Sequence, residues 1–202
     1  MDNRNFNGVL SLNSPTGKQM TKYVNNKNTS LPVALWLATD NYDYQNDPMT
    51  ISTTTIIKPI RQIVLGMQAV SQGMDTVAEV SDMVASRMGT SFHDSIEHAW
   101  THKYEDGLAA LGYPQTIIDK VRINPEEQED DTIPVYLEQR SERLAGPYTI
   151  SGKFDMVMEG SVRDFKSTST YTYEKGINDT KYVLQGSVYR WLNPEIITSD
   201  VM

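Results

Sequence analysis

Residues 152–166 constrain the fold most, because they contain two short strand-like runs on either side of a turn. Glu159-Gly160 separates the two runs, and a glycine in this position is typical of a tight turn. In the second run, the polar residues Asp164 and Lys166 alternate with Phe165, as in a strand that is buried on one face. The segment therefore predicts a β-hairpin, so that the fold contains an antiparallel pair of strands.

The hairpin is expected to bring three charged side chains together. Side chains two positions apart share a face of a strand, so Asp164 and Lys166 should project together while Phe165 turns into the core. The turn folds Asp155 back toward them. Two carboxylates can hold a divalent ion, and a lysine beside them can stabilise charge on an attacked phosphate. The set is typical of a metal-dependent phosphodiesterase, and the alternative is a surface ion pair. Glu138, on the preceding strand, could approach the site but is not counted among its ligands.

Apolar periodicity predicts helices around this hairpin. Residues 89–100 place apolar side chains three and four positions apart, with Gly89 at the helix start and Phe92 on the core-facing stripe. Residues 135–140 alternate as a strand, and residues 181–192 return to the helical period. This order predicts an α/β (α+β) fold, in which a mixed central β-sheet is flanked by helices.

Four sequence elements follow one another in the order of a known nuclease family. They are Gly89-Thr90-Ser91-Phe92-His93, Asp155, Asp164-Phe165-Lys166 and Gln185-Gly186-Ser187-Val188-Tyr189. Together they resemble the PD-(D/E)xK nuclease superfamily, and the Gln-x-x-x-Tyr element is similar to that of its RecB-like exonuclease branch. The resemblance covers roughly residues 87–192. It implies a restriction-endonuclease-like core.

The resemblance also implies roles for single residues. Gln185 and Tyr189 would orient the active-site lysine or hold the DNA backbone. Oxygen ligands with at most one imidazole suit Mg²⁺ or Mn²⁺ better than zinc. The catalytic and metal-binding groups would be His93, Asp155, Asp164, Lys166 and the backbone carbonyl of Phe165.

The implied activity is Mg²⁺-dependent hydrolysis of DNA by an exonuclease, in phage recombination or DNA degradation. Residues 148–153 and 189–194 resemble phage proteins of this kind. DNA is the expected partner, with a recombination protein as a further candidate. Two alternatives stay open: a structure-selective endonuclease with the same site, and a non-catalytic DNA-binding or assembly protein that retains the fold.

The chain is expected to divide into an N-terminal helical region, residues 1–86, and a nuclease core, residues 87–202. A helix predicted within residues 52–65 would belong to a cover over a DNA end. Ser52 or Thr54 at its start would add donors for a terminal phosphate. Lys58 and Arg61, three apart on one face, would bind the same phosphate. The alternative is an ordinary capped helix with solvated basic side chains.

Composition sets further bounds. The 202 residues include no cysteine, which excludes a disulfide framework and thiolate chemistry. The formal net charge of -8 argues mildly against a nucleic-acid partner, although residues 126–131 hold much of the excess acid. No apolar run reaches membrane-spanning length, so a cytoplasmic protein without a membrane partner is expected, in the host cytoplasm if phage-encoded. The resembled core continues into another strand past residue 192, so a truncated chain is expected.

Overall fold

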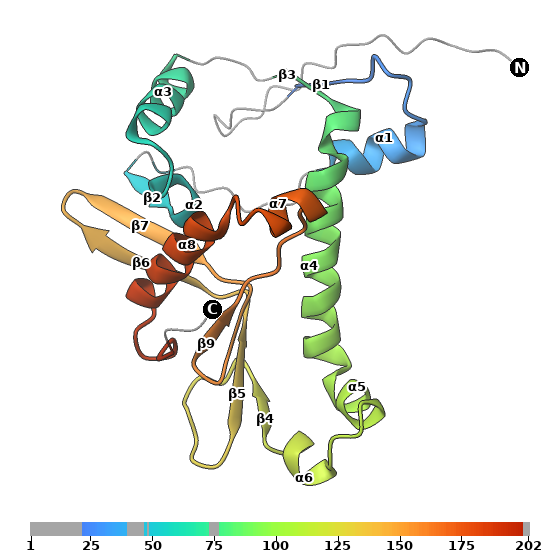
Figure 1. Cartoon of the computed structure of the whole chain (residues 1–202), viewed down its shortest axis with the longest axis vertical. Helices are drawn as coiled ribbons and strands as arrows, with labels where there is room; N and C mark the ends of the chain where they lie inside the picture. Colours follow the sequence, from blue (N-terminus) through green and yellow to red (C-terminus); the bar gives the residue numbers. More distant parts are fainter. Residues whose placement is uncertain (1–21, 40–46, 48, 73–76, 200–202) are drawn as a thin grey trace, which may run out of the picture. The chain divides into compact units, whose positions relative to one another are not determined.

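The chain folds into helices and mixed β-sheets, a mixed α/β architecture (Figure 1). The computed structural model describes residues 22–39, 47, 49–72 and 77–199. Two compact units are present. The smaller contains Met1–Asn46 and Ile60–Met88, and the larger contains Asp47–Pro59 and Gly89–Met202. The expected division at residue 86 thus lies two residues from a boundary, but Asp47–Pro59 belongs to the larger unit.

The smaller unit pairs two short parallel strands and buries one side of a short helix. Its core contains Ala34, Leu37 and Val80. The apolar segment at residues 31–38 forms α1. The described elements of this unit are β1 (Lys22–Val24), α1 (Leu31–Ala38), α3 (Ile60–Ser71), β3 (Val77–Glu79), the 3-10 helix η1 (Val80–Met83) and the start of α4 (Val84–His102). Strands therefore occur in a region that was expected to be helical.

Two sheets form the larger unit. The first has the order β2-β7-β6, with β2 parallel and β6 antiparallel to β7. The second has the order β4-β5-β8-β9, in which only β4 and β5 are parallel. The strands are β2 (Thr50–Ser52), β4 (Val121–Ile123), β5 (Ile133–Leu137), β6 (Arg140–Ala145), β7 (Tyr148–Lys153), β8 (Met156–Met158) and β9 (Ser161–Arg163).

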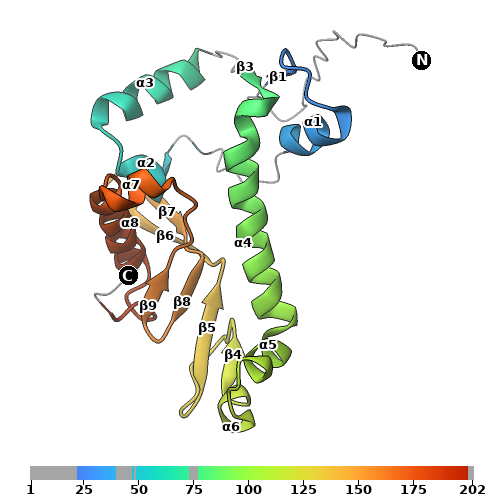
Figure 2. The same ribbon diagram turned by 45° about the vertical axis from the view of Figure 1, so that its right-hand side comes forward.

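Helices pack against these sheets, and α8 lies over the sheet of β6 and β7 (Figure 2). This contact is close at Gly152, where a Cβ would lie 2.7 Å from Leu192 Cδ1 and would also collide with the Thr53 hydroxyl. Besides α4, the helices of this unit are α2 (Thr53–Ile56), α5 (Tyr104–Ala110), α6 (Gln115–Ile118), α7 (Thr170–Glu174) and α8 (Asp179–Leu192).

The predicted hairpin is confirmed as β8 and β9. Val157 pairs with Val162, and the turn residues Glu159 and Gly160 have φ angles of 52° and 74°. Two positive φ angles match the twist of the flanking strands, and glycine adopts one of them at no steric cost. Apolar side chains cover both faces of this sheet. One cluster contains Tyr136, Phe154, Val157, Val162, Tyr189 and Ile197, and the other contains Val121, Val135, Leu137 and Met156.

Two helix predictions need correction. Gly89 does not begin a helix, because α4 already starts at Val84, and Phe92 is 53% exposed although it was expected to face the core. The helix expected within residues 52–65 is broken. Pro59 lacks the N–H that a continuous helix needs, so α2 ends at Ile56 and α3 begins at Ile60. Among the described residues, no helix combines the length and apolarity that crossing a membrane requires.

Candidate metal centre

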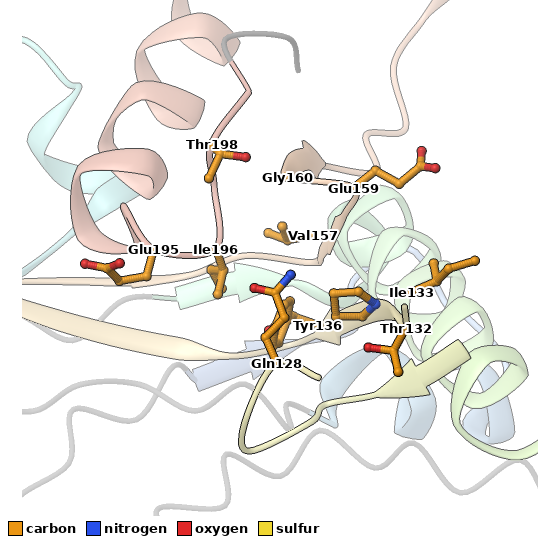
Figure 3. Close-up of a pocket in the computed structure, with 11 residues that line it drawn as sticks. Gln128, Thr132, Ile133, Tyr136, Val157, Glu159, Gly160, Glu195, Ile196 and Thr198 are labelled. Carbon is orange, nitrogen blue, oxygen red and sulfur yellow. The ribbon is translucent and has the colours of Figure 1, made fainter. Parts of the chain in front are cut away.

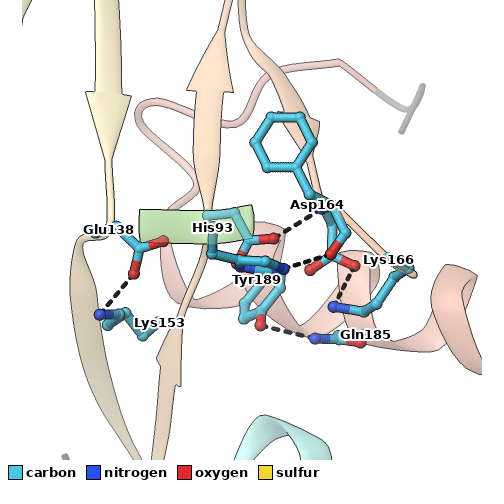
Figure 4. Close-up of polar contacts among 9 residues, drawn as sticks. His93, Glu138, Lys153, Asp164, Lys166, Gln185 and Tyr189 are labelled. Carbon is cyan, nitrogen blue, oxygen red and sulfur yellow. Dashed lines mark hydrogen bonds and ion pairs between the residues drawn. The ribbon is translucent and has the colours of Figure 1, made fainter. Parts of the chain in front are cut away.

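The hairpin places two aspartates at the same end of the sheet. Met156 of β8 pairs with Arg163 of β9, and Asp155 and Asp164 are the next residues outward on the two chains. The backbone N–H of Phe165 donates to Asp155 Oδ2 at 2.7 Å. The expected gathering of these carboxylates is therefore present, although Asp164 and Lys166, which lie close together in Figure 4, follow β9 rather than lying within it.

Asp164 is the most deeply buried charged group of the cluster. Its side chain is 3% exposed, and within the described part of the chain neither carboxylate oxygen has a hydrogen-bond partner. Lys166 Nζ lies 2.6 Å from Asp164 Oδ2 and is itself 34% exposed. The two groups are close enough to form an ion pair, but their orientation does not allow a hydrogen bond. A buried carboxylate is costly when it lacks partners, so Asp164 is suited to a cation.

The environment of Asp155 raises the pKa of its carboxyl group above the ordinary value. Burial is the largest cause, and the negative charge of Asp164 is the second. The Phe165 N–H, His93 and Lys166 act in the opposite direction without cancelling the rise. A carboxyl group whose pKa is raised by burial and by a neighbouring negative charge is common in metal sites before the ion binds.

His93 reaches the hairpin from α4. Its Nε2 lies 2.6 Å from the backbone carbonyl oxygen of Phe165, and its Nδ1 lies 3.4 Å from Asp155 Oδ1. The ring therefore contacts two of the groups that were expected to bind a metal. The structure brings together the whole predicted set of metal ligands: His93, Asp155, Asp164 and the Phe165 carbonyl.

Glu138 also lies in this cluster; the sequence indicated that it could approach the site, but it was not counted among the ligands. Ligand atoms of His93, Glu138 and Asp155 all lie within 4.8 Å of one another. Glu138 follows β5, whose last residue pairs with Met156, and its backbone N–H donates to the Asp155 carbonyl at 3.0 Å. The available signal was its position at the end of the strand beside the hairpin.

Gln185 and Tyr189 form a buried pair on α8. Gln185 Nε2 donates to the Tyr189 hydroxyl at 2.8 Å, one turn along the helix. Both residues are at least 96% buried, so they have little surface to offer to a DNA backbone. Of the two roles implied by the resemblance, orienting groups around the site is the one that this burial permits.

The residues expected to bind a terminal phosphate do not form the predicted arrangement. Ser52 caps α2, where its hydroxyl accepts from the Thr55 N–H, and α2 is only four residues long. Lys58 follows α2, whereas Arg61 lies in α3 and in the other unit. The prediction of one helix carrying Lys58 and Arg61 on one face is therefore wrong, and Thr54 is exposed within the short helix.

A separate cavity of about 370 Å³ lies near the turn of the hairpin, at the opposite end of β8 and β9 from Asp155 and Asp164 (Figure 3). It is lined by Gln128, Thr132, Ile133, Pro134, Tyr136, Val157, Glu159, Gly160, Glu195, Ile196 and Thr198. Two carboxylates and no basic side chain line it, so this cavity is unsuited to a phosphate.

Comparison with protein-family models, with curated proteins and with solved structures finds no match for this chain. Carboxylates, one imidazole and one carbonyl form a donor set that fits Mg²⁺ or Mn²⁺. The buried Asp164 oxygens, which have no hydrogen-bond partner in the part of the chain that the structure describes, support that fit.

Proposed function

We propose that the chain is a metal-dependent nuclease that hydrolyses phosphodiester bonds in DNA. The observation that carries this proposal is the buried Asp164 carboxylate, which has no hydrogen-bond partner among the described residues and lies beside Asp155 and Lys166. Such a carboxylate is suited to binding a divalent cation, and the bound cation can in turn attract an anionic substrate such as a phosphodiester. The order of the sequence elements adds the PD-(D/E)xK resemblance and a restriction-endonuclease-like core to the proposal.

The residues of the cluster would have two roles, metal binding and stabilisation of charge on the substrate. Asp155, Asp164, His93 and the Phe165 carbonyl would hold Mg²⁺ or Mn²⁺. When bound, such an ion acidifies a water molecule and neutralises charge on the phosphate. The ammonium group of Lys166 is partly exposed, so it can reach a substrate phosphate and stabilise the negative charge that develops there.

The mode of cutting follows from the resemblance rather than from the geometry. We propose an exonuclease of the RecB-like branch, acting in phage recombination or DNA degradation in the host cytoplasm. The buried bond between Gln185 and Tyr189 supports an orienting role for this pair on α8. DNA is the proposed substrate, and a recombination protein is a candidate partner.

The test is digestion of end-labelled linear DNA and covalently closed circular DNA, with and without Mg²⁺. We expect digestion of the linear DNA that requires Mg²⁺ and is abolished in both Asp164→Ala and Lys166→Ala. Lys120→Ala is the matched control, because Lys120 forms a 2.6 Å ion pair with Asp131 on the surface. Rapid cutting of circles would favour an endonuclease. DNA binding without any cleavage would contradict the proposal.

A further inference from the structure

Glu138 and Lys153 form an ion pair at the edge of the candidate metal centre. The Glu138 carboxylate is 17% exposed and lies 2.5 Å from Lys153 Nζ, which is 40% exposed. Figure 4 shows this carboxylate between Lys153 and the side of the cluster that holds His93. Neither residue has a role in the proposed hydrolysis, although the Glu138 carboxylate lies near the proposed ligands.

The backbone holds Glu138 in this position. Its φ angle of 52° lies in the left-handed region, which side chains other than those of Asn and Asp rarely adopt. The hydrogen bond from its N–H to the Asp155 carbonyl holds it beside a proposed ligand, directly before β8. A strained conformation that the surrounding structure maintains is common at functional sites.

The charges near Glu138 are unevenly distributed. Asp155 and the buried Asp164 both carry carboxylates in the cluster, and Asp164 lacks a hydrogen-bond partner among the described residues. A carboxylate of Glu138 adds a third negative group within 4.8 Å of the His93 and Asp155 ligand atoms. Lys153 neutralises this third group from outside. A divalent ion in the cluster would be attracted to Glu138 and would repel the ammonium group.

We propose that Glu138 is a further ligand of the metal centre, and that its carboxylate remains paired with Lys153 until the metal ion binds it. This inference rests on the proposed function, because it assumes an ion at Asp155 and Asp164. Binding of the ion weakens the Glu138–Lys153 pair and frees an exposed ammonium group beside the site. The freed Lys153 can then pair with a phosphate of the substrate, which couples loading of the ion to binding of DNA.

Calorimetric titration with Mn²⁺ tests this proposal without any nuclease assay. Glu138→Gln should weaken Mn²⁺ binding about tenfold or more, since it removes a charged ligand. Lys153→Gln should tighten it by about threefold to tenfold, since it removes a competing cation. The double variant should bind Mn²⁺ like Glu138→Gln, because Lys153 acts through Glu138. Asp131→Asn and Lys120→Gln, which break the surface pair of similar length, should change nothing.

A second variant separates loss of the ligand from loss of the fold. Glu138→Asn keeps a residue that tolerates a positive φ angle, and circular dichroism checks that both Glu138 variants are folded. It should bind Mn²⁺ as weakly as Glu138→Gln does.

Three results would contradict the proposal. If Asp155→Asn loses Mn²⁺ while both Glu138 variants bind within about twofold of wild type, Glu138 is not a ligand and only this inference fails. If Lys153→Gln binds Mn²⁺ equally well or more weakly, the exchange is refuted. If wild type binds no Mn²⁺ even with DNA present, the inference and the metal centre fail together.

Discussion

The buried carboxylate of Asp164 predicts a protein that becomes more stable when a residue of its active centre is replaced. Asp164→Asn keeps the shape of the side chain and removes its charge. We expect the metal-free variant to have a higher free energy of unfolding than metal-free wild type. The physical reason is that the charge of Asp164 is 97% buried and also repels Asp155.

The magnitude follows from the surroundings of Asp164. A buried polar group without a hydrogen bond costs about 1–3 kcal/mol, and more when it is charged. The contact with Lys166 offsets part of this cost, but it is partly exposed and is worth less than about 1 kcal/mol. The variant should therefore gain about 1 kcal/mol, which raises the melting temperature of a chain of this length by about 2–4 °C.

Urea and thermal unfolding in EDTA, followed by circular dichroism, measure this gain. In the same scans, added Mg²⁺ should raise the free energy of unfolding of wild type and leave that of Asp164→Asn unchanged. Asp131→Asn is the control, because Asp131 is 82% exposed and its loss should stay within about 0.5 kcal/mol. The reasoning is refuted if Asp164→Asn is less stable than wild type in EDTA, or if Mg²⁺ stabilises both proteins equally.

Three further predictions concern the ion, the pH and the packing. Ca²⁺ should bind to the protein but support little cleavage, because it acidifies water less than Mg²⁺ does; equal cleavage rates with the two ions would contradict the site. The pKa of Asp155 is raised in the folded protein, so its contribution to stability is present below its ordinary pKa of 3.8 and is lost as the pH rises through the folded value. Metal-free wild type should therefore lose stability relative to Asp155→Asn as the pH rises above about 4, and urea midpoints of the two proteins that stay parallel across the pH range would disprove this. Gly152→Ala should destabilise the protein by about 1–3 kcal/mol, because its methyl group would collide with Thr53 and Leu192. Gly107→Ala on α5 is the control: the added methyl group would meet no described atom within 4 Å, so the free energy of unfolding should stay the same or rise.

Local patterns predicted the elements whose contacts are close in sequence. The hairpin of β8 and β9 could be recognised because its turn and its alternation lie within a few residues. The helix at the end of the chain could be recognised from its period alone, and α8 covers residues 179–192. The gathering of Asp155, Asp164 and Lys166 follows directly from that hairpin.

The rest depends on contacts that a local pattern does not contain. Ser52 was expected to start a helix and does cap α2, but the sequence did not show that Thr50–Ser52 also form β2 by pairing with β7. Glu138 joins the cluster through the pairing of β5 with β8 and through a positive φ angle. Neither feature leaves a periodic signal in the sequence, so the sequence indicated that Glu138 could approach the site but not that its carboxylate lies among the ligand atoms.

The pairing of β2 with β7 also has a consequence for the order in which the chain folds on the ribosome. Thr53, directly after β2, donates a hydrogen bond to Ser151 of β7, which is synthesised 98 residues later. At about 5–20 residues per second, that interval lasts about 5–20 s. Residues 60–88 emerge in the meantime and supply the remaining part of the smaller unit. The smaller unit can therefore complete its contacts while β2 still waits, unpaired, for the strand that closes its sheet.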